Sequence, residues 1–263
     1  MRAIVVLALL SVVASRLLSL EKREDRVLKE TDSQWCDSPV KKAPVKFPES
    51  IVGRADINFD MNSGYVNVTD HDFLYYWQMG TQDKNEKAPL IIWTNGGPGC
   101  SSMEAATTEN GPLSLFDIKE SCSDEKEQCD YTNQFSTNRY SWNAHANLIY
   151  VDQPRFVGNS GGDSQAQGVH SSVDAASDFV TFYRGIIDIF PEYSGKDLII
   201  AGESYGGHYI PAFAQAILDE NKQHPENLIP LAGAIIGNGC VNGTCILCKI
   251  FFYHILQWHQ YTT

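Results

Sequence analysis

Residues 197–209 read DLIIAGESYGGHY, and this short segment combines the signals of a strand, a turn and a helix. Residues 198–201 form an apolar run typical of a buried strand, whereas residues 209–218 carry apolar side chains at helical spacing. Pro211 is expected in the first turn of that helix, where a missing N–H is tolerated. Between the two elements, a G-x-S-x-G pattern predicts a sharp turn that strains the backbone of Ser204 and exposes its hydroxyl as a nucleophile.

Strands and helices alternate along the rest of the chain. Apolar runs recur at residues 90–93, 148–151 and 231–236, and helical or loop segments separate them. Two further strands are expected at residues 65–68 and 73–77, joined by a turn. This alternation predicts an α/β fold with a mostly parallel sheet and flanking helices.

The longest helical pattern covers residues 172–190. Its apolar face, which we expect to pack in the core, consists of Val173, Ala176, Phe179, Val180, Tyr183, Ile186, Ile187 and Phe190. Asp174 and Asp178 lie in the first turns, where acidic side chains suit the helix dipole. Pro191 is expected to end the helix.

The composition excludes some classes of partner. Acidic residues outnumber basic ones, 32 to 20, so the formal net charge is −12, and we expect no nucleic-acid partner. Cys245 and Cys248 have the spacing of a redox or zinc-binding pair, but no second such pair accompanies them. We therefore expect neither a metal nor a cofactor.

The N-terminal residues indicate export. Residues 1–19 read as a signal peptide, with a retained signal anchor as the alternative, and residues 20–44 as a charged leader or propeptide. The apolar run is too short to span a bilayer, so we expect no membrane partner. Seven cysteines and two glycosylation triplets, at Asn67 and Asn242, suit a disulfide-bonded glycoprotein of the secretory pathway, extracellular or vacuolar/lysosomal. Because seven is odd, at least one thiol has no partner within the chain.

A second glycine-rich turn follows the apolar run at residues 90–93. Residues 89–102 read PLIIWTNGGPGCSS, and the missing β-carbons of such a turn let backbone N–H groups face a ligand. Together with VDQP at residues 151–154 and GESYGGHYIP at residues 202–211, this segment resembles the serine carboxypeptidase family. The sequences SGYVNV and GNG at residues 63–68 and 237–239 fit the same resemblance.

The resemblance implies an α/β-hydrolase fold that is incomplete at its C-terminus. It runs from about residue 51 to about residue 239, so we expect residues 45–239 to be the N-terminal part of the domain and residues 240–263 a divergent tail. It also implies that Cys100 has its disulfide partner in a half that is absent here.

The same resemblance implies an exopeptidase site. Ser204 corresponds to the nucleophile, and the N–H groups of Gly97 and Tyr205 to the oxyanion donors. The positions that hold the terminal carboxylate of a peptide or protein substrate correspond to Asn95, Gly96 and Glu203, and Glu109 to the acid that shares a proton with Glu203. A carboxylate approaches two carboxyl groups only when they are largely protonated, which burial and proximity promote.

The catalytic machinery is expected to be incomplete. A nucleophilic serine of this fold needs an acid and then a histidine later in the chain. After Ser204 there is one aspartate, Asp219, and its position at the end of a helix does not suit the role. The later histidines, none of which has a suitable setting, are His208, His224, His254 and His259. We therefore expect little activity from this chain alone.

Three other interpretations stay open. In the first, the chain is one part of a two-chain carboxypeptidase. In the second, it binds peptide C-termini without cleaving them, and in the third it is a related acyltransferase. Asn95 and Glu203 favour the peptidase over the acyltransferase. Beyond the substrate, a second chain or a homo-oligomer is the partner to expect.

Overall fold

The computed structural model describes residues 41–48, 52, 55–115, 135–163 and 168–241. The chain divides into two units, Met1–Pro39 and Val40–Thr263, and every described residue belongs to the second. The signal peptide, most of the leader and tail, Asn242, His254 and His259 therefore lie outside the described residues. Within the described ranges, no helix is both long enough and apolar enough to cross a bilayer.

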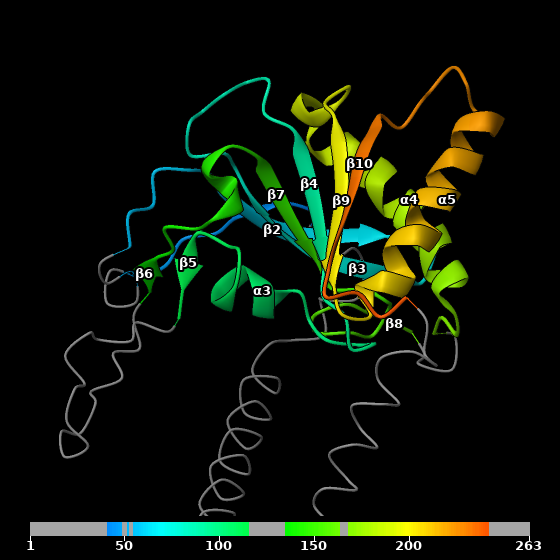
Figure 1. Cartoon of the computed structure of the whole chain (residues 1–263), viewed down its shortest axis with the longest axis horizontal. Coiled ribbons are helices and arrows are strands. Elements are labelled where there is room, and N and C mark those ends of the chain that lie inside the picture. Colours follow the sequence, from blue (N-terminus) through cyan, green and yellow to red (C-terminus); the bar gives the residue numbers. More distant parts are fainter. Residues whose placement is uncertain (1–40, 49–51, 53–54, 116–134, 164–167, 242–263) are drawn as a thin grey trace, which may run out of the picture. The chain divides into compact units, whose positions relative to one another are not determined.

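An eight-stranded mixed sheet forms the centre of the fold (Figure 1). Its main path runs β1 (Ala43–Pro44), β2 (Met61–Asn67), β3 (Asp72–Met79), β7 (Asn147–Val151), β4 (Leu90–Thr94), β9 (Leu198–Glu203) and β10 (Leu231–Gly237). β8 (Gly161–Gly162) pairs with β3, and a separate two-stranded sheet joins β5 (Leu113–Ser114) to β6 (Ser136–Thr137). The four strands β7, β4, β9 and β10 are parallel to one another, as the alternation of strands and helices predicted.

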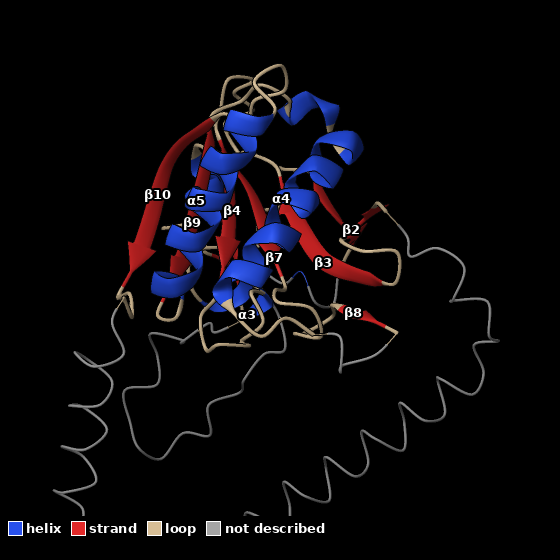
Figure 2. Cartoon of the chain, turned by 90° about the vertical axis from the view of Figure 1, so that its right-hand side faces the viewer, coloured by secondary structure: helices blue, strands red, loops and turns tan. Residues whose placement is uncertain are grey.

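Helices cover both faces of the sheet. Figure 2 shows α4 (Ser172–Ile189) and α5 (Gly206–Gln223) side by side on one face. The other face carries α3 (Met103–Thr108) and the short helix η2 (Trp142–Ala144); another short helix, η4 (Pro191–Tyr193), follows α4. Alternate side chains of β4 enter the two cores: Ile92 packs with α4 and α5, whereas Ile91 packs with α3. β4 and β7 are therefore buried along their whole length and β9 along most of it, whereas the side chains of β10 are partly or fully exposed.

Two details of α4 differ from the expectation. Most of the predicted apolar face is buried or partly buried, but Val173 is 74% exposed at the start of the helix. Asp174 accepts a hydrogen bond from the hydroxyl of the N-cap residue Ser171, as an acid in a first turn does. Asp178 instead points inward and is buried in an ion pair with Arg155. α4 ends before Pro191, as predicted.

The predicted position of Pro211 is wrong. α5 begins at Gly206, directly after the turn, so Pro211 lies inside the helix, beyond its first turn. Gly206 and Gly207 carry no side chain and gave no apolar signal, which hid the true start of the helix. The strand bounds differ by smaller amounts: β2 begins four residues before residue 65 and ends one before residue 68, and β3 extends two residues past residue 77.

Candidate active site

Ser204 occupies a strained turn between β9 and α5. Its φ angle is +53°, a left-handed conformation that costs a non-glycine residue energy. Backbone hydrogen bonds hold the turn from the β10 side: Ser204 N–H donates to the Gly237 carbonyl at 2.9 Å, and Cys240 N–H donates to the Ser204 carbonyl at 2.7 Å. A β-carbon at Gly202 would lie 2.7 Å from the Thr94 carbonyl oxygen, so glycine is required there. The sharp turn with an exposed serine is confirmed.

The glycine-rich turn after β4 lies directly against the Ser204 turn. A β-carbon on Gly96 would lie 2.5 Å from the Tyr205 nitrogen and 2.8 Å from the Ser204 β-carbon. Gly97 follows with φ +107°, which only glycine adopts readily, and it is exposed. β4 and β9 are parallel neighbours, so both turns emerge at the carboxyl ends of their strands. The structure thus brings the predicted nucleophile and the segments with both predicted oxyanion donors together.

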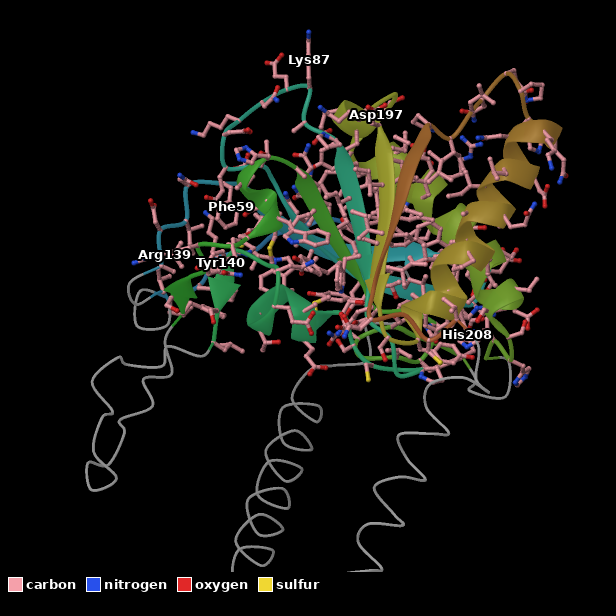
Figure 3. The ribbon with its side chains drawn as sticks, in the orientation of Figure 1. Phe59, Lys87, Arg139, Tyr140, Asp197 and His208 are labelled. Atoms are coloured by element: carbon pink, nitrogen blue, oxygen red, sulfur yellow. The ribbon has the colours of Figure 1, made fainter. Side chains whose placement is uncertain are left out.

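Figure 3 places this site at one end of the sheet. β9 runs from the labelled Asp197 toward the end where the labelled His208 lies, while Lys87 marks the opposite end. A hollow of about 400 Å³ adjoins the glycine-rich turn and is lined by residues that include Pro98, Gly99, Phe156 and Tyr209. A larger, polar cleft of about 990 Å³ is lined by Gln78, Tyr193 and others at the end opposite Ser204. The hollow beside Pro98 lies next to the turn that carries Gly97, at the Ser204 end of the sheet, where it can receive part of a molecule bound at Ser204.

Asn95 is buried and its amide is oriented by a neighbour. The indole N–H of Trp93 donates to Asn95 Oδ1 at 2.7 Å. That bond assigns the oxygen to Trp93 and turns the amide nitrogen Nδ2 toward Glu203 Oε1, 3.5 Å away. The Asn95 backbone N–H donates to Ser102 Oγ at 3.0 Å, which fixes the start of the turn. Asn95 and Glu203 are thereby brought together, as predicted.

Three acidic side chains influence one another beside this pair. Partial burial, and after it the charge of Glu203, raises the pKa of Glu109 above its ordinary value. Burial, followed by the charge of Glu104, raises the pKa of Glu203 as well. Glu109 follows α3 and Glu203 ends β9, so the fold places two acids from distant parts of the chain within electrostatic reach. Glu104 was not predicted; it lies on α3, five residues before Glu109.

The buried carboxylate of Asp152 holds the residues that follow the glycine-rich turn. Asp152 accepts hydrogen bonds from Ser101 Oγ at 2.6 Å, Ser102 N–H at 2.9 Å and Asn159 N–H at 2.9 Å. It stands directly after β7, at the same edge of the sheet as the Ser204 turn. In the sequence, VDQP at residues 151–154 indicated only a family resemblance, and the hydrogen bonds of Asp152 to the turn were not predicted. An aspartate directly after an apolar strand run was the available signal.

No described histidine is hydrogen-bonded to the hydroxyl of the candidate nucleophile. The Ser204 hydroxyl makes no hydrogen bond with any residue of the described ranges, and the ring of His208 lies 4.5 Å from the ring of Tyr205 instead. His224 lies just beyond α5, near Glu226 at 3.4 Å. Asp219 lies on α5 and pairs with Lys222 at 2.7 Å.

The remaining predicted features are placed as follows. Asn67 is exposed at the end of β2, where a glycan has room. Among the described residues, Cys100 and Cys240 are both free thiols, and the other five cysteines lie outside. No cluster of three or more potential metal ligands occurs in the part of the chain that the structure describes.

Comparisons with known proteins agree with this geometry. Residues 48–249 match the family model described as serine carboxypeptidase. The chain is 39% identical to the pheromone-processing carboxypeptidase KEX1 of Fusarium vanettenii, over 70% of this chain and 28% of the relative. It is 41% identical to carboxypeptidase Y of Candida albicans, over 67% and 29%, and 39% identical to serine carboxypeptidase-like 36 of Arabidopsis thaliana, over 72% and 36%. The chain thus spans well under half the length of each relative.

A solved structure shares the fold. The chain superimposes on Kex1Δp, a prohormone-processing carboxypeptidase from Saccharomyces cerevisiae, with a TM-score of 0.61 and 29% identity. The match covers 74% of this chain and 43% of the other.

Proposed function

The chain belongs to the serine carboxypeptidase family, and on that premise we propose that it contributes the nucleophile and the carboxylate site of an enzyme that removes C-terminal amino acids from peptides. The α/β-hydrolase fold inferred from the sequence agrees with the family and the structural match. One observation carries the proposal: the strained Ser204 turn lies against the Gly96–Gly97 turn, beside the Asn95–Glu203 pair.

The chemistry proceeds by acyl transfer. Ser204 Oγ attacks the carbonyl carbon of the last peptide bond, and the negative charge on the carbonyl oxygen receives hydrogen bonds from the Gly97 and Tyr205 N–H groups. The C–N bond then breaks, the C-terminal amino acid leaves with a proton, and water releases the acyl group from Ser204. The proton transfers need a group near Ser204 that acts first as a base and then as an acid, and no residue of the described ranges is hydrogen-bonded to its hydroxyl. We therefore propose that the chain alone hydrolyses peptides very slowly.

The free carboxylate of the substrate is the feature to be recognised. Asn95 Nδ2 and the Gly96 N–H are donors suited to a carboxylate, and a protonated Glu203 adds a third. The raised pKa of Glu203 and that of Glu109 favour the protonated forms, which removes repulsion between like charges. Binding should be tightest in mildly acidic solution, which suits a vacuolar or secretory compartment, where we propose that the protein resides.

A second candidate function is recognition without cleavage. The Ser204 hydroxyl has no hydrogen-bonded base among the described residues, whereas the Asn95–Glu203 pair is already assembled. A chain of this kind binds peptide C-termini by itself. It becomes an enzyme only when a second chain supplies the acid and the histidine.

Labelling and binding experiments separate these functions. A fluorophosphonate reacts with activated serines, so the purified full chain should label slowly, and Ser204→Ala should not label at that position. A peptide with a free C-terminus should bind, the same peptide amide should not, and Asn95→Ala should weaken binding by about tenfold or more.

Three outcomes are informative. Rapid labelling of Ser204 and release of C-terminal amino acids by the chain alone would show that its catalytic machinery is complete. Binding without labelling would support the recognition function. Equal binding of the peptide and its amide would sink the assignment of the carboxylate site.

A further inference from the structure

The VDQP segment at residues 151–154 takes no part in the proposed acyl transfer, yet it contains two buried polar side chains. Asp152 and Gln153 directly follow β7, and both are buried. β7 is the parallel neighbour of β4, so the two residues emerge beside the glycine-rich turn that follows β4. Burial of polar side chains costs free energy unless they are hydrogen-bonded, so the partners of Asp152 and Gln153 indicate what these residues do.

Asp152 uses one carboxylate oxygen for each of two loops. Its Oδ1 accepts hydrogen bonds from Ser101 Oγ at 2.6 Å and from Ser102 N–H at 2.9 Å, at the end of the glycine-rich turn. Its Oδ2 accepts from the backbone N–H of Asn159 at 2.9 Å and from the Asn159 side-chain amide at 3.3 Å. The carboxylate therefore ties the glycine-rich turn to the loop that follows β7.

Gln153 and Ser102 hold the beginning of the same turn. Gln153 Nε2 donates to Thr94 Oγ1, and Thr94 Oγ1 donates to the Asn95 carbonyl at 3.2 Å. Ser102 Oγ accepts from Asn95 N–H at 3.0 Å and donates to the Val151 carbonyl at 2.6 Å. Both ends of the turn, at residues 94–95 and 101–102, are thus fixed to the residues at the end of β7.

The middle of the turn, residues 97–100, is exposed. Cys100 N–H donates to the Gly96 carbonyl at 3.2 Å, and the Tyr209 hydroxyl is hydrogen-bonded to the backbone of Gly99. An oxyanion donor stabilises developing charge only if it is already held in place when the reaction begins. For the Gly97 N–H, that placement depends on how firmly the two ends of the exposed turn are held.

We propose that Asp152 and Gln153 are positioning residues for the oxyanion site. They hold both ends of the glycine-rich turn and so keep the Gly97 N–H where the carbonyl oxygen of the scissile bond becomes negative. Both side chains are buried, so they act through the turn and not on the substrate itself. The inference rests on the proposed function and adds to it the residues that prepare the site.

Two ligands separate the oxyanion site from the carboxylate site. The first is a peptide with a free C-terminus. The second is the same peptide with a phosphinate in place of its last peptide bond, so that a phosphinate oxygen stands where the oxyanion forms. Both bind without any proton transfer, and titration calorimetry with the purified full chain measures both affinities. The wild type should bind the phosphinate more tightly than the peptide.

Asp152→Asn should weaken phosphinate binding selectively. An amide has one acceptor oxygen, so its nitrogen faces the N–H of Ser102 or of Asn159 and one of the two loops is released. The phosphinate affinity should fall about tenfold or more, since loss of a whole oxyanion donor costs about 10²–10³ in rate. The peptide affinity should change less than about threefold, because Gly96 packs against the Ser204 turn independently of Asp152. Gln153→Met should act in the same direction.

Two milder variants and one spectroscopic signal complete the test. Ser101→Ala removes one donor to Asp152 Oδ1 and should show the same selective loss to a smaller degree, even if Asp152→Asn does not fold. Asn159→Ala keeps the backbone N–H that binds Oδ2 and should leave both affinities unchanged. In the unliganded protein, the amide NMR signal of Gly97 should move in Asp152→Asn and Ser101→Ala and stay in place in Asn159→Ala. Circular dichroism checks that each variant folds.

Several results would overturn the inference. If Asp152→Asn and Ser101→Ala weaken both ligands equally, or weaken neither, the two side chains only support the fold. A Gly97 signal that neither variant moves shows that the turn keeps its position without Asp152. A wild type that binds the peptide but gains nothing from the phosphinate has no prepared oxyanion site, which refutes this inference and leaves the carboxylate site standing. A wild type that binds neither ligand refutes the proposed function itself, and the inference with it.

Discussion

At the residue scale, the absence of a side chain at Gly96 lets the glycine-rich turn pack directly against the Ser204 turn. The turn that carries Gly96 touches the Ser204–Tyr205 backbone, and no room remains for a β-carbon. Gly96→Ala must push the two turns apart, so we expect the affinity for a peptide C-terminus to fall about tenfold or more, with a loss of about 1–3 kcal/mol in the free energy of unfolding. Calorimetric binding and thermal unfolding measure the two effects.

Gly80→Ala provides the matched control. A β-carbon at Gly80 would have its nearest neighbour 3.5 Å away, an ordinary contact, and Gly80 lines the cleft at the other end of the sheet. This variant should bind peptide as the wild type does. If Gly96→Ala also binds normally, the two turns do not form one site.

The acidic residues predict how binding depends on pH. Because the pKa values of Glu109 and Glu203 are raised, both acids stay protonated to a higher pH than ordinary carboxyl groups. They lose their protons as the pH rises through these raised values, and the affinity for a peptide carboxylate should then fall. Glu203→Gln keeps a neutral donor at all pH values, so its affinity should depend less on pH than that of the wild type. Titration calorimetry from about pH 4 to about pH 8, starting near the ordinary carboxyl pKa, measures the difference.

Glu104→Gln sharpens the test. The charge of Glu104 raises the pKa of both other acids, so its removal should shift the binding profile to lower pH without flattening it. A profile that Glu104→Gln leaves unmoved would mean that the three acids do not interact as the structure indicates.

At the scale of the elements, α4 and α5 are joined by aromatic contacts. The rings of Phe179 and Phe213 stack at 4.3 Å, and the ring of Tyr209 lies 5.9 Å from that of Phe213. Phe213 is fully buried, so Phe213→Ala should lower the free energy of unfolding by about 3–5 kcal/mol.

The exposed end of α4 supplies the comparison. Val173→Ala removes a side chain that solvent already surrounds, so it should change the free energy of unfolding by less than about 0.5 kcal/mol. Urea unfolding followed by circular dichroism compares the two variants. A large effect of Val173→Ala would show that Val173 packs in the core, as the sequence predicted.

At the scale of the whole molecule, local patterns predicted most of the framework. Apolar runs of strand length gave β4, β7, β9 and β10, and glycine patterns gave both turns at the candidate site. That the two turns meet follows from the rule that the carboxyl ends of parallel strands lie at one edge.

What the sequence did not reveal are the contacts between distant positions. Asp178 fits a helix N-terminus, yet its partner Arg155 lies 23 residues earlier in a loop. Asp72 looks like a turn residue, yet it begins β3 and is buried. Periodicity reports which face of an element is apolar; it does not report which polar side chains become paired once the faces are packed.

Arg155 joins three separate parts of the chain. Its Nε and Nη2 atoms donate to both carboxylate oxygens of Asp178 on α4, and Nη1 donates to Asp72 at the start of β3, all at 2.7 Å. Both aspartates are buried, so Arg155→Met leaves two carboxylates without their cation and should cost about 3–5 kcal/mol of unfolding free energy.

The cause of that loss is itself testable. If uncompensated charge is responsible, adding Asp72→Asn and Asp178→Asn to Arg155→Met should recover part of the stability, because the buried groups are then neutral. Lys222→Met breaks the exposed pair with Asp219 and should leave the urea midpoint unchanged. If Arg155→Met behaves like Lys222→Met, the ion pair does not hold these parts together. If the triple variant is no more stable than Arg155→Met, packing of the arginine side chain, and not its charge, joins β3 to α4.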